Sequence, residues 1–315
     1  MRRDQIIKIA MVVCAVVAAC AVIISLTGMF GSGSLFSYAN ADKYTAGEAE
    51  VSGDIRNLEV NWTSGKVTIT YHAEDTVTLK ESANGTLSDD QKLRWWLDGD
   101  TLRVQYAKSN ISIGWNKQKE LTVTLPESMR LQRADIGTTS ADLYAPTLKA
   151  EKVTLGSTSG DITAETDAKT VDAGATSGSI RLKLTADADS VKTGTTSGSV
   201  FLEAGKARKI DAGSTSGGIE IRAEEAGEVK IGCTSGTVRV NLRKPEKLHV
   251  STTSGSITAG LSAEPGFTAS VSTVSGSVNC GLAAAKNGDR YVCGDGSAAV
   301  ELGSVSGSIT IREAE

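Results

Sequence analysis

The sequence predicts an all-β fold: a β-solenoid, or β-helix, with rungs of about 19 residues and a less regular amino-terminal β cap, preceded by one transmembrane helix. Three observations predict it. Thr-Ser-Gly recurs at a nearly constant spacing, apolar and polar residues alternate on both sides of each copy, and a long run near the amino terminus carries no charge. Glycine is frequent (33 residues) and aromatic residues make up only 4% of the chain, which suits thin, closely stacked β layers.

The amino-terminal segment is predicted to anchor the chain in a membrane. A basic tail, residues 1–8, precedes residues 9–30, which contain no charged residue. As a helix this run would be about 33 Å long at roughly 1.5 Å per residue, enough to cross a bilayer. The basic residues before it place the amino terminus in the cytoplasm and the bulk of the chain outside, after a linker at residues 31–50. We therefore expect a single-pass protein of the cell membrane.

Three alternatives for this segment stay open. A cleavable signal peptide would use Ala39, Asn40 and Ala41 as its cleavage site, although the apolar run is longer than usual and ends well before that site. A lipoprotein would be acylated at Cys20, although the sequence stays apolar beyond that cysteine. A buried core helix would be unusually long.

The repeat is defined by the glycine that closes each Thr-Ser-Gly copy or near copy. From Gly160 to Gly276 these glycines lie 18–21 residues apart, and a step of 31 residues leads to Gly307. A spacing near 19 residues is typical of a solenoid and too short for helical repeats. We assign the repeats to residues 131–312, with an insertion at residues 280–296. The closing glycines are predicted to be structural corners: Gly65, Gly160, Gly178, Gly198, Gly217, Gly236, Gly255, Gly276 and Gly307.

Each flank of a copy has the alternation of a strand with one buried face. Around one corner, Val171 and Ala173 precede the glycine, and Ile180 and Leu182 follow it, each pair two residues apart. The position three before the glycine is always small, so Cys233, which fills it in one copy, is predicted to be a buried spacer. Glycine at the corner allows either a positive φ or close approach of successive rungs, and nearby hydroxyls can bond the backbone of the bend.

One outward column is predicted to set the register of the rungs. Six residues before the closing glycine stand Asp172, Lys192, Asp211 and Lys230, followed by His249. Because rungs stack about 4.8 Å apart, opposite charges would alternate along this face, and a slip by one rung would put like charges together. This pattern favours a self-paired, solvated face over a charged binding strip.

Residues 51–130 are predicted to cover the amino-terminal end of the solenoid, because an open β edge would pair with other chains. Five strand-like segments joined by polar turns occur there: 67–70, 76–79, 93–97, 101–106 and 120–125. Trp62 stands in a column that later rungs fill with small residues, so it is expected to close that end. Trp96 is a candidate for stacking on a sugar ring or a lipid surface, with a place in the capping layer as the alternative.

The sequence offers no catalytic, cofactor-binding or metal-binding constellation. Serine nucleophiles need a base, and His72 and His249 cannot serve all the repeated serines. No Cys/His spacing indicates zinc, and a formal net charge of −4 argues against nucleic acid as a partner. We therefore expect a protein that is not an enzyme and holds no cofactor. Cys280 and Cys293 flank the glycine-rich insertion and are a candidate disulfide in an oxidising compartment.

The order of these features resembles a bacterial family. The anchor is followed by DIRNLEVNWTSGKVTI (residues 54–69), LTVTLPESMRLQRADIGTTSADL (residues 121–143) and serial TSGSI-like units. This pattern is similar to the DUF4097 family of adhesin-like β-strand repeat proteins, over about residues 50–312. The resemblance implies an exported β-solenoid at the cell envelope, with some relatives tied to envelope-stress and antimicrobial-peptide responses and no catalytic residues to transfer. The insertion at residues 280–296 departs from the family pattern.

We expect a non-enzymatic envelope protein that binds a partner outside the membrane: cell wall, lipid, a cationic peptide or another envelope protein. A structural spacer, or a component of a membrane complex without a soluble ligand, is the alternative. A polysaccharide-active β-helix enzyme is disfavoured, because no repeat column gathers Asp, Arg or Lys into a catalytic groove.

Overall fold

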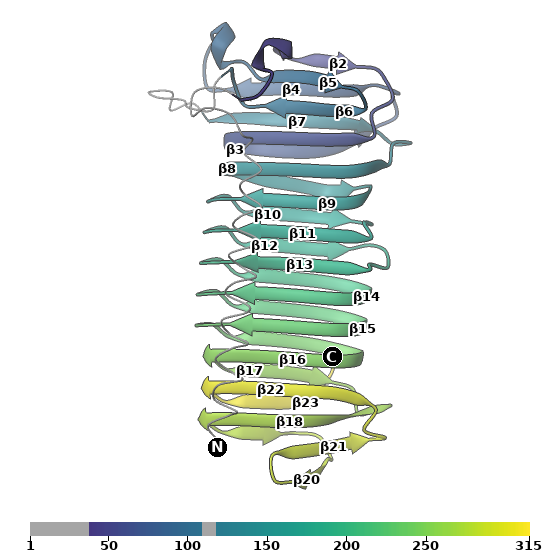
Figure 1. Cartoon of the computed structure of the whole chain (residues 1–315), viewed down its shortest axis with the longest axis vertical. Helices are drawn as coiled ribbons and strands as arrows, with labels where there is room; N and C mark the ends of the chain where they lie inside the picture. The colour runs from purple at the N-terminus through teal and green to yellow at the C-terminus, as the bar shows by residue number, and fades with distance from the viewer. Residues whose placement is uncertain (1–37, 109–117) are drawn as a thin grey trace.

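The computed structural model describes residues 38–108 and 118–315, most of which lie in β-strands (Figure 1). The all-β solenoid predicted from the sequence is confirmed. No helix within these two ranges is long and apolar enough to cross a bilayer. The apolar run at residues 9–30 lies outside them, so the transmembrane anchor stays a prediction.

Two stacks of parallel strands run the length of the molecule, and each corner joins a strand of one stack to a strand of the other to make a rung. The stack before the corners contains, in spatial order, β6 (Thr101–Gln105), β3 (Asn57–His72), β8 (Leu131–Leu148), β9 (Ala150–Ser157), β11 (Thr170–Ala175), β13 (Ser190–Thr195), β14 (Val200–Ser214), β15 (Ile219–Cys233), β16 (Val238–Ser254), β22 (Ala298–Ser306) and β18 (Gly266–Ser275). The stack after the corners contains β7 (Lys119–Pro126), β3, β8, β10 (Ile162–Thr166), β12 (Ile180–Leu184), β14, β15, β16, β17 (Ile257–Leu261), β23 (Ile309–Glu313) and β19 (Val278–Cys280).

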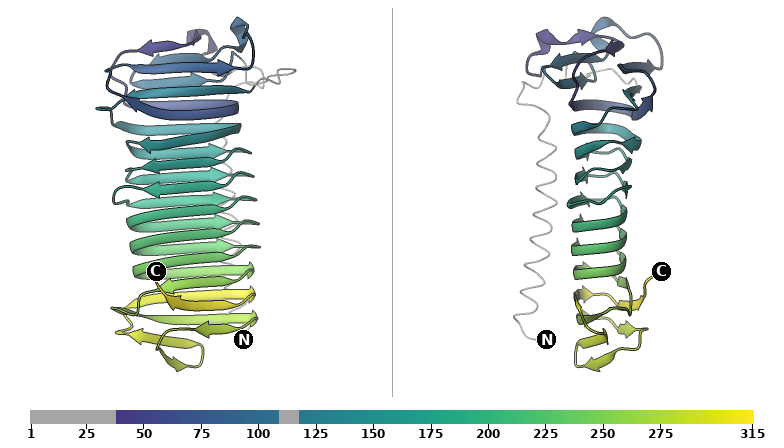
Figure 2. Two further views of the ribbon diagram at one scale, coloured as in Figure 1. Left: turned by 180° about the vertical axis from the view of Figure 1, so that it is seen from behind. Right: turned by 90° about the vertical axis from the view of Figure 1, so that its right-hand side faces the viewer.

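The inward columns form one continuous hydrophobic core between the two stacks. Val171, Ala173, Ile180 and Leu182 are buried, as their alternation predicts, and nearly all the equivalent residues of the other rungs belong to the same cluster or pack against it. Neighbouring rungs pair in register, so that each apolar side chain stacks on its equivalent one rung away. With strands about 4.8 Å apart, the stack is long and thin, as the two views of Figure 2 show.

The corner glycines are required by the close approach of successive rungs. A Cβ added to Gly217 would lie 1.5 Å from the carbonyl oxygen of Gly198, and one added to Gly178 would lie 1.9 Å from that of Gly160. Real Cβ atoms do not come this near to backbone, so no other residue fits without moving a rung. From the sequence, either close approach of the rungs or a positive φ could explain the need for glycine. At these corners the reason is close approach.

The conformation of the corner differs at the end of the stack where β3 lies. Gly65 has a φ of 100°, in the region that favours glycine, and its added Cβ would lie 2.0 Å from the carbonyl oxygen of Lys119. Both reasons for glycine therefore apply at this corner.

At many corners a buried hydroxyl lies three residues before the glycine, whereas Ala175 and Cys233 hold this position in two rungs. In one rung Ser214 Oγ accepts a hydrogen bond from the N–H of Gly217 at 2.8 Å. In the preceding rung Thr195 Oγ1 accepts from the N–H of Gly198 and donates to the carbonyl of Gly178, both at 3.0 Å. Because a hydroxyl both donates and accepts, this small inward position ties a corner to itself and to the next rung. Cys233, buried at the same position, confirms the predicted spacer.

Both ends of the stack are built out of sequence order. At the carboxyl end β22 and β23 lie between the rung of β16 and β17 and the rung of β18 and β19. At the amino end β3 lies between β8 and the rung of β6 and β7, so that residues 57–72 form a rung inside the stack. The chain thus inserts a rung from near each end of the described fold between two others.

The outward charge column follows this spatial order and not the sequence order. Asp172, Lys192, Asp211 and Lys230 stack one above the other, as predicted. After His249 the column continues with Glu301 of the inserted rung, and the His249 Nδ1 atom lies 3.0 Å from a Glu301 carboxylate oxygen. The inserted rung therefore contributes an acidic residue, Glu301, as the next member of this column of alternating charges.

Antiparallel strands cover the two ends of the stack. At the amino end these are β1 (Thr45–Ala46), β2 (Ala49–Val51), β4 (Val77–Ala83) and β5 (Arg94–Asp98), with two short 3₁₀ helices, η2 (Ala41–Lys43) and η3 (Asp89–Gln91). At the other end β20 (Ala285–Asn287) and β21 (Arg290–Gly294) form a hairpin from the predicted insertion. These covers limit pairing of the solenoid ends with other chains.

Replacing a corner glycine should destabilise the solenoid sharply. We expect Gly217→Ala to cost about 2 kcal/mol or more, because the new Cβ meets backbone that cannot move without separating two rungs. Gly205→Ala is the matched control, since nothing lies within 4 Å of its added Cβ. Urea unfolding followed by circular dichroism measures both. Equal midpoints for the two variants would contradict the close-approach explanation.

Candidate functional site

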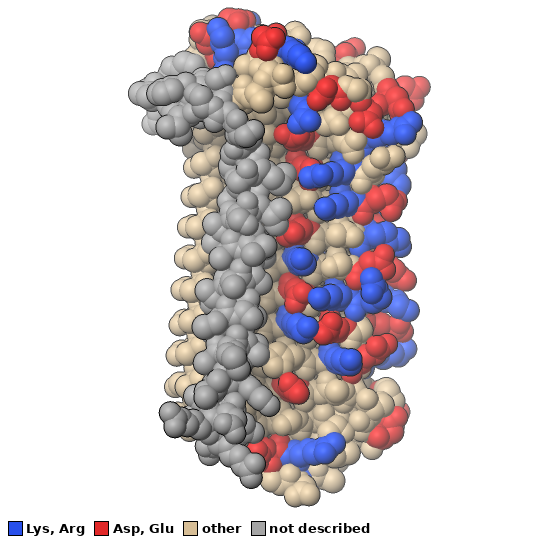
Figure 3. All heavy atoms as spheres, in the orientation of Figure 1, with Lys and Arg blue, Asp and Glu red and all other residues tan. Residues whose placement is uncertain are grey.

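The edge opposite the corners carries most of the charges of the central rungs. Here each strand after a corner bends into the strand before the next corner, and we call this edge the bend edge. Successive bends carry charges of alternating sign: Asp187 and Asp189; Lys206, Arg208 and Lys209; Glu224, Glu225 and Glu228; Arg243, Lys244 and Lys247 together with Glu246. Figure 3 shows charges over the bend edge and the adjoining flat face, while the opposite edge is without charged atoms in this view.

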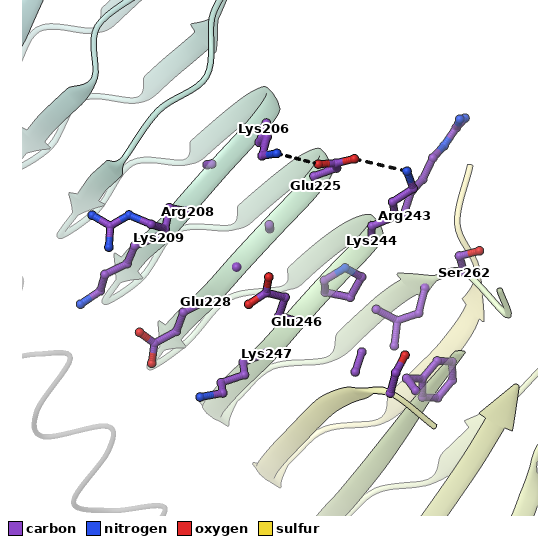
Figure 4. Close-up of a pocket in the computed structure, with 18 of the residues that line it drawn as sticks. Lys206, Arg208, Lys209, Glu225, Glu228, Arg243, Lys244, Glu246, Lys247 and Ser262 are labelled. Carbon is purple, nitrogen blue, oxygen red and sulfur yellow. Dashed lines mark hydrogen bonds and ion pairs between the residues drawn. The ribbon is translucent and has the colours of Figure 1, made fainter. Parts of the chain in front are cut away.

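Ion pairs connect each bend with its neighbours. The carboxylate of Glu225 lies 3.1 Å from the Lys206 ammonium on one side and 3.2 Å from the Lys244 ammonium on the other (Figure 4). Hydrogen bonds from these two lysines hold the pKa of Glu225 below its usual value. Arg208 lies 3.6 Å from Asp189 in the same manner. Because these side chains are solvent-exposed, each pair adds little stability, and their main effect is to specify which bends lie together.

A groove of about 1070 Å³ runs along the bend edge between these charged side chains. Small residues line it where the bends stack: Ala188, Ala207, Ala226 and Pro245. Beyond β16 the groove ends in a hollow beside Leu261, Ser262, Pro265 and Ser297. The groove offers charges of both signs and small apolar residues, which suits recognition of an extended polymer more than a compact substrate.

The sequence carries a signal for this edge, which lies outside the residues that flank the corners. The bend residues lie midway between two closing glycines, and their sign changes from one repeat to the next. The outward column of Asp172 and Lys192, which the sequence did single out, lies on the flat face. There Lys230 pairs with Glu228 of its own strand at 2.8 Å.

The repeated serines of the corners have no base beside them. The Nε2–H of His72 donates a hydrogen bond to the carbonyl oxygen of Thr76 (2.7 Å), and His249 pairs with Glu301. Neither imidazole bonds a corner serine in the described ranges. Within the same ranges no three His, Cys, Asp or Glu side chains cluster as metal ligands would. The corners therefore serve the backbone, as the glycine and hydroxyl contacts show.

The cap contains a buried ion pair that the sequence did not indicate. Lys119 and Glu81 have side chains only 2% and 4% exposed, and the ammonium lies 2.5 Å from the carboxylate. The ammonium also donates to the carbonyls of Gln91 (2.6 Å) and Tyr106. The carboxylate accepts the N–H of Leu93. Burial lowers the pKa of Lys119, and the hydrogen bond with Glu81 opposes this shift.

Aromatic rings enclose this ion pair from the solenoid side. The Lys119 ammonium lies 4.9 Å from the ring centre of Trp62 and 4.0 Å from that of Tyr106. The Trp62 indole N–H donates to the carbonyl of Lys119 at 3.1 Å. Trp62 is fully buried in the column of small corner residues, next to Thr138 of the following rung. Because β6 and β7 lie beyond β3, Trp62 fills the core one rung inside this end and does not close it, which corrects the expectation from the sequence.

Trp96 lies in the capping layer. Its ring meets Tyr44 edge-on at 5.7 Å, and the Lys43 ammonium lies 4.8 Å from the ring centre. The side chain is partly exposed, so contact with a sugar or a lipid stays a hypothesis. Trp115 lies outside the described residues.

Cys280 and Cys293 lie close to one short segment at the carboxyl end. Cys280 Sγ is 3.8 Å from the carbonyl oxygen of Leu282, and Cys293 Sγ is 3.7 Å from that of Ala283. Both are free thiols in the structure. Burial raises the pKa of Cys293, and the neighbouring Cys280 adds to the shift. The disulfide proposed from the sequence therefore stays a prediction.

The fold and the bend edge together define a class of protein: an end-capped parallel β-solenoid with one corner edge of mostly small residues and one charged bend edge. The profile of the Toastrack DUF4097 family matches residues 55–312. The chain belongs to this family, as its sequence pattern predicted. No curated protein sequence matches the chain.

The solved structures that are similar to the chain include two from bacteria. One is a protein from Clostridium sporogenes ATCC 15579 with a proposed role in cell adhesion, at 16% identity over 86% of this chain and 100% of that chain, with a TM-score of 0.25. The other is a proposed adhesin from Bacteroides fragilis NCTC 9343, at 14% identity over 85% of this chain and 97% of that chain, with a TM-score of 0.37. Neither similarity bears on function.

Breaking the buried ion pair should loosen the cap. We expect Lys119→Met to cost about 3 kcal/mol, because it leaves the Glu81 carboxylate buried without a counter-charge. The double variant Lys119→Met/Glu81→Gln should cost less, since an amide oxygen still accepts the N–H of Leu93 and no charge is buried. Thermal unfolding of the single and double variants measures this. A double variant as unstable as the single one would contradict the ion-pair explanation.

The cap should lose stability in alkali as its tyrosines ionise. Burial, with a smaller contribution from Tyr44, raises the pKa of Tyr38 to about 12 from the ordinary 10.0. A raised folded-state pKa stabilises the fold fully below pH 10 and loses this effect as the pH rises towards 12. Tyr38→Phe should flatten the fall of the unfolding midpoint across this window. Tyr144→Phe, on the exposed face, is the control, and an unchanged slope in Tyr38→Phe would contradict the assignment.

Proposed function

We propose that this chain is a non-enzymatic protein of the cell envelope, anchored by residues 9–30, whose solenoid binds a partner outside the membrane along the bend edge. The observation that carries the proposal is the groove of the bend edge. It repeats one set of charged and small residues over several rungs of a scaffold closed at both ends. Repeated weak contacts along a rigid surface suit binding of an extended partner.

An uncleaved anchor is supported by the burial of Tyr38 in the cap. Tyr38 is only 7% exposed and its ring meets that of Tyr44 at 4.9 Å. Cleavage after Ala41 would remove this buried side chain from the cap. Seven residues, 31–37, connect the apolar run to Tyr38 and span at most about 25 Å when extended. In this arrangement the cap lies near the membrane and the hairpin of β20 and β21 points away from it.

A spacer without a soluble ligand is the second candidate function. It is favoured by the rigidity of the scaffold, because eleven stacked rungs of roughly 4.8 Å spacing hold the two ends about 50 Å apart. A spacer would make its contacts through the cap or the distal hairpin, and the bend edge would be dispensable. The location of the binding surface therefore distinguishes the two functions.

Protease treatment of intact cells that express the chain tests the location. We expect release of peptides from the solenoid while residues 1 to about 40 stay with the membrane. Protection on intact cells with digestion after lysis would overturn the topology. A mature amino terminus at Asp42 would replace the anchor by a cleaved signal peptide.

Crosslinking in the same cells tests the binding surface. A photoreactive residue at position 209 of the bend edge should capture a partner, whereas one at position 216 on the corner edge should not. Capture only from the cap or the distal hairpin would favour the spacer.

A further inference from the structure

The groove ends where one bend of the solenoid is missing. β17 ends at Leu261 and the chain then leaves the stack, while β22 enters the other stack at Ala298. β16 therefore pairs with β17 up to Leu242 and with β22 from Lys247 onward. On that side residues 243–246 have no strand partner among the described residues. Their backbone faces the hollow (Figure 4).

The last complete bend also keeps an excess of positive charge. Glu225 is shared between Lys206 and Lys244, and Glu228, opposite Lys247, pairs instead with Lys230. Lys247 forms no ion pair within the part of the chain that the structure describes.

The remaining charges of this bend do not remove the excess. Arg243 lies 3.6 Å from Glu224 of the preceding bend, and its Nε–H also donates to the carbonyl oxygen of Glu315 at 3.4 Å. Glu246 is the one acid among the charged residues of its own bend. In the alternating series the next bend would be acidic, and neutral residues such as Ser262 and Ser297 line the hollow in its place.

We propose that this hollow accepts an extended acidic segment of a partner protein, which pairs with β16 at residues 243–246 and continues the charge alternation. This inference deepens the proposed function, because it rests on the bend edge as the binding surface and names its partner class. The segment adds to a free strand edge by main-chain hydrogen bonds, and its carboxylates face Lys244 and Lys247.

The size and chemistry of the hollow favour a peptide over other anions. A strand rises about 3.3 Å per residue, so four residues cover roughly 13 Å, the length of the unpaired stretch of β16. Proline at position 245 has no N–H to donate. Because residues of a strand direct their N–H and C=O groups alternately to its two sides, alternate residues of 243–246 offer their backbone groups to the hollow. An anionic lipid or wall polymer could meet the lysines, yet it would leave the edge of the strand unpaired. A cationic peptide, expected from the acidic chain as a whole, would meet like charges here.

Fluorescence anisotropy with the full-length chain in detergent tests the proposal. The probe is a labelled peptide that alternates Glu and Val, and the Lys/Val peptide of equal length is its counterpart. We expect saturable binding of the Glu/Val peptide that weakens as salt is added. Lys244→Glu/Lys247→Glu should weaken it at least about tenfold. Lys80→Glu/Lys92→Glu, with the same change of charge on the cap, should change it less than about twofold.

Two further measurements separate the possible outcomes. Lys247→Ala removes no ion pair of the described structure, so a loss of affinity in this variant does not come from misfolding. N-methylation of alternate peptide residues should abolish binding if the main chain pairs with β16.

Binding that survives methylation, or that is found only with vesicles of anionic phospholipid, would overturn the acidic strand as occupant. So would equal binding of the Lys/Val peptide. Crosslinking at position 209 without peptide binding would sink this inference and leave the proposed function standing. Protection of intact cells from protease would affect only the proposed location.

Discussion

The whole solenoid depends on the contact between a corner glycine and the carbonyl oxygen of the corner glycine one rung away. At the corner of Gly217 this contact leaves no room for a Cβ. Because the corners approach so closely, the strands on both sides are held in register, and the inward columns stack like on like. At one corner the buried hydroxyl of Thr195 bonds both its own corner and the neighbouring one. The repeated Thr-Ser-Gly therefore has a structural role: it shapes the backbone of the corner.

The two ends of the solenoid show how a repeat protein protects its terminal rungs. In a stack built in sequence order the last rung has a neighbour on one side only, and it frays. Here β22 and β23 lie between two rungs, and β3 does the same at the other end. Opening either rung breaks contacts on both sides. The cost is kinetic, because these pairings join residues far apart in sequence and long-range contacts slow folding.

The two edges of the molecule have opposite chemistry because they meet different constraints. The corner edge is limited to small residues by the close approach of its glycines. The bend edge carries long charged side chains, which pair between rungs through residues such as Glu225. Alternating sign makes each bend fit its neighbours and repel the bends two rungs away, so the edge helps to specify the order of the rungs. The alternation stops at the bend that contains Lys247. No acidic bend follows it in the described chain.

The sequence by itself determined the all-β class, the rung length, the corners and the inward columns such as Val171 and Ile180, because each depends on residues close together in the chain. Only the tertiary structure decided where the last rung is inserted, which buried partner Lys119 finds in Glu81, and that the bend edge ends in a hollow. The 31-residue step before Gly307 indicates an interruption of the repeat. It does not show that the strands after the interruption lie between two earlier rungs. That choice depends on pairing between strands distant in sequence, and the spacing of a repeat carries no information about it.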